Sequence, residues 1–228
     1  MGAFTSVDIG ADGRGLISYY ADSNGDLKVA HCSNEHCSAA TVSTIDSNGD
    51  VGRYSSIAIG ADGLGLISYY DNSGGDLRVA HCSNITCTAA NTATVDSTGN
   101  VGRFGSITIG SDGLGLISYY NQTSGDLMVA HCANAACATA ATATLDSADD
   151  VGQYTSLSIG ADGLGLVAYY DATHAVLKVA HCIDLACSGA TAVTLDGAAN
   201  VGAYAAVTVG VDGLPLVSYF RDTGDSLM

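Results

Sequence analysis

Tryptophan is absent from this sequence, proline and glutamate (Glu35) each occur once, and basic residues number only seven. Binding to nucleic acid or to an anionic membrane surface needs a basic face, which a chain with a formal net charge of -16 does not provide. No apolar run approaches the roughly 20 residues that a membrane-spanning helix needs. We therefore expect an acidic protein that neither binds nucleic acid nor inserts into a membrane.

The sequence consists of one unit that recurs every fifty residues. In the second unit, turn-forming residues separate four apolar segments: Tyr54–Ile59, Leu66–Tyr70, Leu77–Cys82 and Ala89–Val95. Short strands with a turn about every ten residues indicate an all-β fold, and no apolar stripe of helical period competes with them. The glycines that open the first turn of each unit are expected to have a positive φ or to lie against neighbouring backbone, namely Gly60, Gly110 and Gly160.

Four strands in each repeat of about 40–50 residues are the pattern of a β-propeller blade. We expect a single β-propeller domain over residues 1–228, with repeats at about 4–53, 54–103, 104–153 and 154–203 and a partial repeat at 204–228. Since the partial repeat holds only the first two segments, we favour five four-stranded blades with an incomplete last blade. One alternative is a larger ring of which this chain is a part. Another is a second chain that covers the open edge of the fifth blade.

Eight cysteines occur as one pair in each of the first four repeats, and four residues lie between the members of a pair. This spacing allows a disulfide within each blade, and it does not exclude zinc bound with a neighbouring histidine. We favour disulfides because each blade offers only two thiols, and disulfides imply an oxidising compartment. The expected location is therefore extracellular or at the cell surface. The pairs are Cys32 and Cys37, Cys82 and Cys87, Cys132 and Cys137, and Cys182 and Cys187.

Two other repeated features have a structural and a functional interpretation. His31, His81, His131 and His181 share one register, and we favour residues copied with the repeat over a ring of ligands. The acidic turns at 22–26 and 46–50 resemble the start of a calcium loop. No carboxylate follows where a calcium loop needs one, so tight hairpin turns are favoured over calcium sites.

The pattern SIxIxxDGxxxISYYDxxxGDLxVA resembles the blade repeat of secreted, mostly bacterial β-propeller proteins. The resemblance covers nearly the whole chain, and it implies extracellular exposure without catalytic residues. The cysteine pair in each blade is a departure from that pattern.

These observations predict a non-catalytic extracellular module that requires no cofactor. It would serve in assembly, with other chains or with copies of itself through the open fifth-blade edge, or in multivalent binding. The alternative is a lectin-like propeller that binds glycans through Tyr20, Tyr70, Tyr120 and Tyr170 with Asp71 and Asp171. A glycosidase-like enzyme is less favoured, because no paired-carboxylate or nucleophile arrangement stands out from the repeat.

Overall fold

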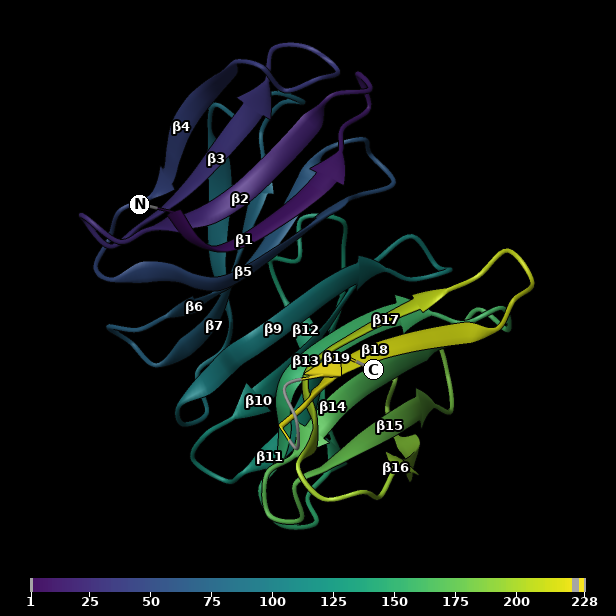
Figure 1. Ribbon diagram of the computed structural model, residues 1–228. Coiled ribbons are helices and arrows are strands. Elements are labelled where there is room, and N and C mark those ends of the chain that lie inside the picture. The colour runs from purple at the N-terminus through teal and green to yellow at the C-terminus, as the bar shows by residue number, and fades with distance from the viewer. Residues whose placement is uncertain (1, 223–225, 228) are drawn as a thin grey trace.

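The computed structural model describes residues 2–222 and 226–227, and every regular element among them is a β-strand (Figure 1). The first two sheets are built from β1 Gly2–Ile9, β2 Gly15–Ala21, β3 Asp26–Cys32, β4 Ala40–Asp46, β5 Val51–Ile59, β6 Gly65–Asp71, β7 Asp76–Cys82 and β8 Ala90–Asp96. The next two are built from β9 Val101–Ile109, β10 Gly115–Asn121, β11 Asp126–Cys132, β12 Ala140–Asp146, β13 Val151–Ile159, β14 Gly165–Asp171, β15 Val176–Cys182 and β16 Ala190–Asp196. Sheet 5 holds β17 Val201–Val209, β18 Pro215–Arg221 and β19 Ser226–Leu227.

The predicted all-β propeller architecture of four-stranded sheets is confirmed. Sheets 1 to 4 each contain four antiparallel strands in chain order, and the described part of sheet 5 contains three. The segments expected in the second unit correspond to β5 to β8, although β5 begins at Val51 rather than at Tyr54. Within the described part of the chain, no helix has the length and apolar character needed to cross a membrane.

Neighbouring sheets pack face to face, and each sheet uses a different face for each neighbour. We call the face that packs on the following sheet the C-side face, and the face that packs on the preceding sheet the N-side face. In sheet 2, Leu66 and Leu77 lie on the C-side face, whereas Ile67 and Tyr69 lie on the N-side face. Because side chains alternate along a strand, β6 is buried along its whole length.

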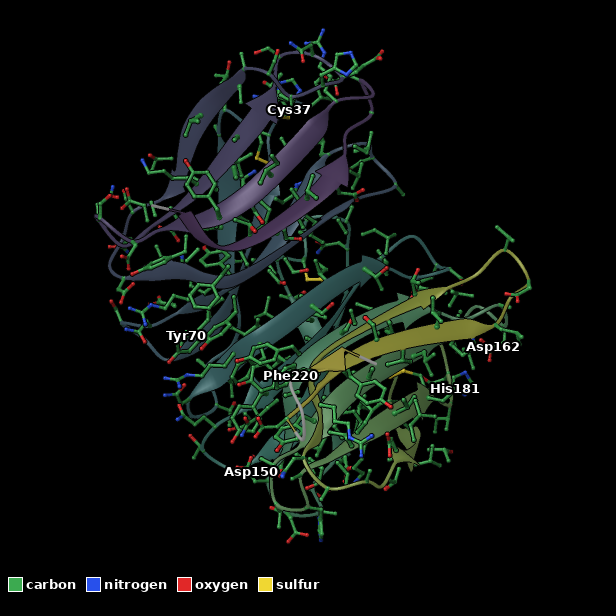
Figure 2. The ribbon with its side chains drawn as sticks, in the orientation of Figure 1. Cys37, Tyr70, Asp150, Asp162, His181 and Phe220 are labelled. Carbon is green, nitrogen blue, oxygen red and sulfur yellow. A yellow bond between two sulfur atoms is a disulfide. The ribbon has the colours of Figure 1, made fainter. Side chains whose placement is uncertain are left out.

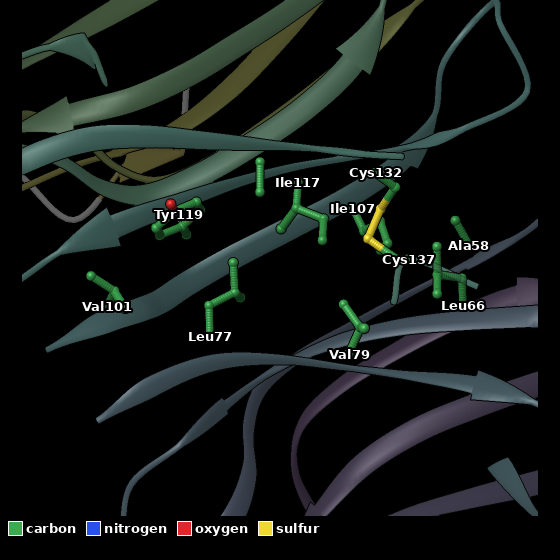
Figure 3. Close-up of a cluster of buried hydrophobic side chains, with 11 residues drawn as sticks. Ala58, Leu66, Leu77, Val79, Val101, Ile107, Ile117, Tyr119, Cys132 and Cys137 are labelled. Atoms are coloured by element: carbon green, nitrogen blue, oxygen red, sulfur yellow. A yellow bond between two sulfur atoms is a disulfide. The ribbon is translucent and has the colours of Figure 1, made fainter. Parts of the chain in front are cut away.

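Each interface between sheets is a compact apolar core. Between sheets 2 and 3, Leu66, Leu77 and Val79 pack with Ile117 and Tyr119 (Figure 3). Burial of each large apolar side chain stabilises the fold by about 1.5–3 kcal/mol. Equivalent clusters join sheets 1 and 2, sheets 3 and 4, and sheets 4 and 5. Four copies of one interface therefore hold the described chain together.

A leucine of one sheet fits over a glycine of the next sheet in the first three interfaces. An added Cβ on Gly65 would lie 2.9 Å from Leu16 Cδ2, which is too close for a side chain to be tolerated without movement of the leucine. The same contact recurs in the next two interfaces, between Leu66 and Gly115 and between Leu116 and Gly165. Glycine at this position therefore lets the sheets approach closely.

The two ends of the arc leave opposite sheet faces uncovered. Val7 on the N-side face of sheet 1 is 61% exposed, whereas its equivalent in sheet 2, Ile57, is 5% exposed. Leu216 on the C-side face of sheet 5 is 68% exposed, whereas its equivalent Leu66 is 1% exposed. The described chain is thus an open arc of five sheets, and closure into a ring is not seen among the described residues.

Candidate binding surface

Five aromatic side chains from equivalent positions lie along the inner edge of the arc. They come from the first strand of each sheet, and these strands contact one another in chain order. Consecutive ring centroids are 4.4–4.8 Å apart and the rings are tilted by 44–54°, an arrangement in which aromatic rings attract each other. We call these residues the aromatic row: Phe4, Tyr54, Phe104, Tyr154 and Tyr204. These residues were not among the predicted ligand residues, although all five repeats carry an aromatic residue at this register.

A β-bulge positions each ring of the aromatic row. In sheet 2 the register of β5 against β6 shifts between Arg53 and Ser56, so that Tyr54 and Ser55 stand opposite a single residue. All five members of the row have a φ between 52° and 54°, a conformation that residues other than glycine rarely adopt. Each costs of order 1–3 kcal/mol, and such conformations gather at functional sites. A similar positive φ, between 47° and 52°, recurs at Cys37, Cys87, Cys137 and Cys187, so the convergence of five rings, and not the φ alone, makes the inner edge the candidate site.

The aromatic row lines an open cavity of about 400 Å³, which we call the central hollow. The rings at its two ends are the most exposed, with Phe4 at 41% and Tyr204 at 67%. The described residues that line it carry no charged side chain: besides the rings they are Thr5, Ser55, Gly105, Thr155 and Ala205. A concave, mostly apolar surface with a few hydroxyl groups has the composition of a ligand site.

The phenol of Tyr154 stays protonated in this environment. Burial, with a further contribution from the Tyr204 hydroxyl, raises the pKa of Tyr154 to about 12. Tyr154 is therefore a neutral hydrogen-bond donor at physiological pH.

The tyrosines predicted as ligand residues form a second row of rings behind the aromatic row: Tyr20, Tyr70, Tyr120 and Tyr170. Phe220 continues this row in sheet 5. Each second-row ring centroid lies 6.1–6.4 Å from the centroid of the aromatic-row ring of its own sheet. The hydroxyls of the first three donate to Asp50, Asn100 and Asp150 of the following sheets at 2.7–2.8 Å. Two guanidinium groups cover second-row rings at 5.2 and 5.1 Å, Arg53 over Tyr20 and Arg103 over Tyr70. These contacts join sheets and support the aromatic row from behind. A direct contact with a ligand stays a prediction.

Asp71 and Asp171, the acidic members of the predicted ligand set, cap their own turns. Asp71 Oδ1 accepts hydrogen bonds from the backbone N–H groups of Ser73 and Gly74, both at 2.9 Å. Asp171 Oδ1 accepts from the backbone of His174 at 2.9 Å. Both carboxylates are buried. In the described part of the chain, no three or more His, Cys, Asp or Glu residues gather in a way that could hold a metal ion.

The opposite end of each of sheets 1 to 4 carries a histidine–aspartate pair and a disulfide. His181 Nε2 lies 2.9 Å from Asp162 Oδ2, and Figure 2 shows this pair far from Tyr70 and Asp150. Because the third strand of each sheet pairs with the second, this histidine reaches the turn between the first two strands. The same pair forms in the other three complete sheets, between His31 and Asp12, His81 and Asp62, and His131 and Asp112.

Each cysteine pair forms a disulfide within its own sheet, with Cα atoms 4.7–4.9 Å apart. This pairing accounts for all the cysteines of the chain and indicates an oxidising compartment.

The described lining of the central hollow can be compared with the two-carboxylate arrangement of glycosidases. Glycoside hydrolysis generally uses two carboxyl groups about 5–9.5 Å apart on either side of the bond that breaks. The described residues that line the hollow include no aspartate or glutamate.

No protein-family model matches the chain, and no curated protein matches it in sequence. Solved structures do match it in fold. An α-L-arabinofuranosidase from Lactobacillus brevis aligns with 100% of this chain and 89% of its own, with a TM-score of 0.60 and 12% identity. An α-L-arabinanase from Penicillium chrysogenum in complex with arabinobiose aligns with 98% of this chain and 78% of its own, with a TM-score of 0.64 and 12% identity. The Dos1 propeller aligns with 98% of this chain and 61% of its own, with a TM-score of 0.58 and 11% identity. Identities this low show a shared propeller fold and nothing about activity.

Proposed function

We propose that this chain is an extracellular, non-catalytic binding module whose central hollow holds a neutral carbohydrate. The observation that carries the proposal is the aromatic row, in which five strained backbone positions present five aromatic rings to one hollow. The four disulfides support an extracellular location, since such bonds persist in oxidising compartments.

The lining of the hollow favours an uncharged sugar over other ligands. The C–H faces of a sugar ring pack on aromatic rings, while its hydroxyls bond to groups such as those of Thr5 and Tyr154. An anion would be repelled by a chain of net charge -16. A cation would find no carboxylate among the lining residues that the structure describes. Two of the solved structures with a similar fold are of proteins named for arabinose-containing substrates, so arabino-oligosaccharides are the first ligands to test.

Titration calorimetry with neutral arabino-, galacto-, gluco- and manno-oligosaccharides tests the proposal. We expect at least one series to bind, with affinity that rises with chain length until the row is filled. Replacement of Tyr54 or Phe104 by glycine removes a ring and suits the positive φ at that position, so these variants should fold. Each should weaken binding at least tenfold.

Ile183→Gly is the matched control, because it removes a large exposed side chain from a loop at the other end of a sheet. This variant should bind like the unaltered chain. Binding that is unaffected by Tyr54→Gly and Phe104→Gly would refute the site, and absence of binding to every neutral series would refute the ligand class. New reducing ends released from any oligosaccharide would contradict the non-catalytic role.

A further inference from the structure

The uncovered faces at the two ends of the arc are the two halves of the interface that repeats inside the chain. Every internal interface joins the C-side face of one sheet to the N-side face of the next. The C-side face of sheet 5 carries Leu216 where the internal face of sheet 2 carries Leu66, and the N-side face of sheet 1 carries Val7 where that of sheet 2 carries Ile57. Both end faces lack a neighbour among the described residues.

We propose that the C-side face of sheet 5 of one copy docks on the N-side face of sheet 1 of a second copy of this chain. The contact is head-to-tail, so it uses two different surfaces and leaves one of each free at the ends of the assembly. It continues the internal series of interfaces from one chain into the next.

The leucine-over-glycine contact is available at this junction. Leu216 is the equivalent of Leu16, Leu66 and Leu116, which are at most 1% exposed because a glycine of the following sheet lies beneath them. Gly15 is the equivalent of those glycines, and the side chains nearest to it belong to its own sheet, with no leucine of another sheet among them. Leu216 of one copy therefore has a matching site at Gly15 of the next.

A hydroxyl pair is also available. Ser18 Oγ and Ser55 Oγ are 3.1 Å apart between sheets 1 and 2, and Ser118 Oγ and Thr155 Oγ1 are 2.9 Å apart between sheets 3 and 4. The equivalent residues at the chain ends are Ser218 and Thr5, and both are exposed. Docking in the internal register places these two hydroxyls within bonding distance.

The junction between copies lacks some internal contacts, so it is weaker than the interfaces within a chain. Ala206 stands where Ser6, Ser56, Ser106 and Ser156 accept a backbone hydrogen bond from the next sheet. Within the chain, an aspartate at the end of the fourth strand of one sheet accepts a hydrogen bond from a tyrosine of the next sheet, namely Tyr69, Tyr119 or Tyr169. Sheet 5 has no fourth strand in its described part, so it offers no such aspartate. Association should therefore be reversible, and salt should strengthen it by screening the repulsion between acidic chains.

Sedimentation velocity of the full 228-residue chain over a wide concentration range tests the proposal. The mass should increase with concentration, and the increase should be larger at high salt. Val7→Glu blocks the N-side face and Leu216→Glu blocks the C-side face, and each should weaken association at least tenfold, because a charge would be buried without a partner. Ile183→Glu, a charge at a 63% exposed position on a loop, is the control and should associate like the unaltered chain.

A mixture of the two blocked variants identifies the direction of the contact. Each variant keeps one working face, so the mixture should form a dimer of one copy of each and nothing larger. The register is tested by adding Ser218→Cys to the Val7→Glu chain and Thr5→Cys to the Leu216→Glu chain. We expect a disulfide-linked dimer only when the two chains are mixed.

Three results would overturn the proposal. The unaltered chain could remain monomeric at every concentration. One blocked variant could associate as well as the unaltered chain, which would mean that a face pairs with its own copy. The mixture could also fail to form the dimer.

Discussion

The replacement of Gly105 by serine should stabilise the protein, because it completes a hydrogen-bond chain that two other interfaces already have. Ser18 Oγ donates to Ser55 Oγ, which in turn donates to the backbone oxygen of Phe4 at 2.8 Å. Between sheets 2 and 3 the equivalent of Ser55 is Gly105, and the buried Ser68 Oγ has no hydrogen-bond partner among the described residues.

The structure has room for the new side chain. A Cβ on Gly105 would have its nearest neighbours at 3.6–3.8 Å, which is ordinary van der Waals contact, and Gly105 does not have a positive φ. Replacement of glycine by alanine at a compatible site stabilises by about 0.4–1 kcal/mol through the unfolded chain. Satisfying a buried hydroxyl adds about 1–2 kcal/mol. We therefore expect Gly105→Ser to raise the free energy of unfolding by about 1.4–3 kcal/mol, and Gly105→Ala by about 0.4–1 kcal/mol.

Equilibrium urea unfolding of a double-mutant cycle measures this difference. The advantage of serine over alanine at position 105 should disappear when Ser68 is replaced by alanine. An equal gain from Gly105→Ser and Gly105→Ala, or a serine advantage that persists without the Ser68 hydroxyl, would refute the hydrogen-bond argument.

Three further predictions follow from the polar contacts and the disulfides. Tyr119→Phe should lower the free energy of unfolding by about 1.5–3 kcal/mol, because the Tyr119 hydroxyl donates a hydrogen bond to the buried Asp96 at 2.7 Å. Tyr69→Phe should lower it by less, since Asp46, the acceptor of the Tyr69 hydroxyl, keeps its ion pair with Arg78 at 2.8 Å. Equal losses for the two variants in urea unfolding would contradict this. Stability should hold up to about pH 10 and then fall as pH rises, because burial, then bonding to carboxylates, raises the pKa of Tyr69, Tyr119 and Tyr169 in the fold. A free energy of unfolding in urea that does not fall above about pH 10 would contradict this. Intact mass should increase by eight hydrogens on full reduction, and free thiols in the unreduced protein would count against the four disulfides.

The strands could be predicted because the sequence repeats its apolar pattern without insertions. Leu66–Tyr70 was expected to be a strand, and β6 spans Gly65–Asp71. The pairing of His31 with Asp12 could not be read from the sequence, since it depends on the register of β3 against β2.

Two features of the backbone were not predictable from residue types. The aromatic row depends on a bulge at Tyr54, and an aromatic residue gives no signal for positive φ. The expectation for Gly60 was wrong, because its φ is not positive, and an added Cβ would meet the Asp62 side chain at 2.8 Å before any backbone atom, the closest of which would be Leu64 O at 3.5 Å. The positive φ of this turn falls on Gly63 instead, at 79°. The same holds for Gly110 and Gly160, whose turns have their positive φ at Gly113 and Gly163.

Hydroxyl-radical footprinting read by mass spectrometry tests the central claim that the chain is an open arc with opposite halves of one interface at its ends. At low concentration, Val7 and Leu216 should be modified, while their internal equivalents Ile57 and Leu66 should be protected. At high concentration, Val7 and Leu216 should become protected together. Protection of both residues at the lowest concentration, in a chain that sediments as a monomer, would show a ring closed on itself and would contradict the account.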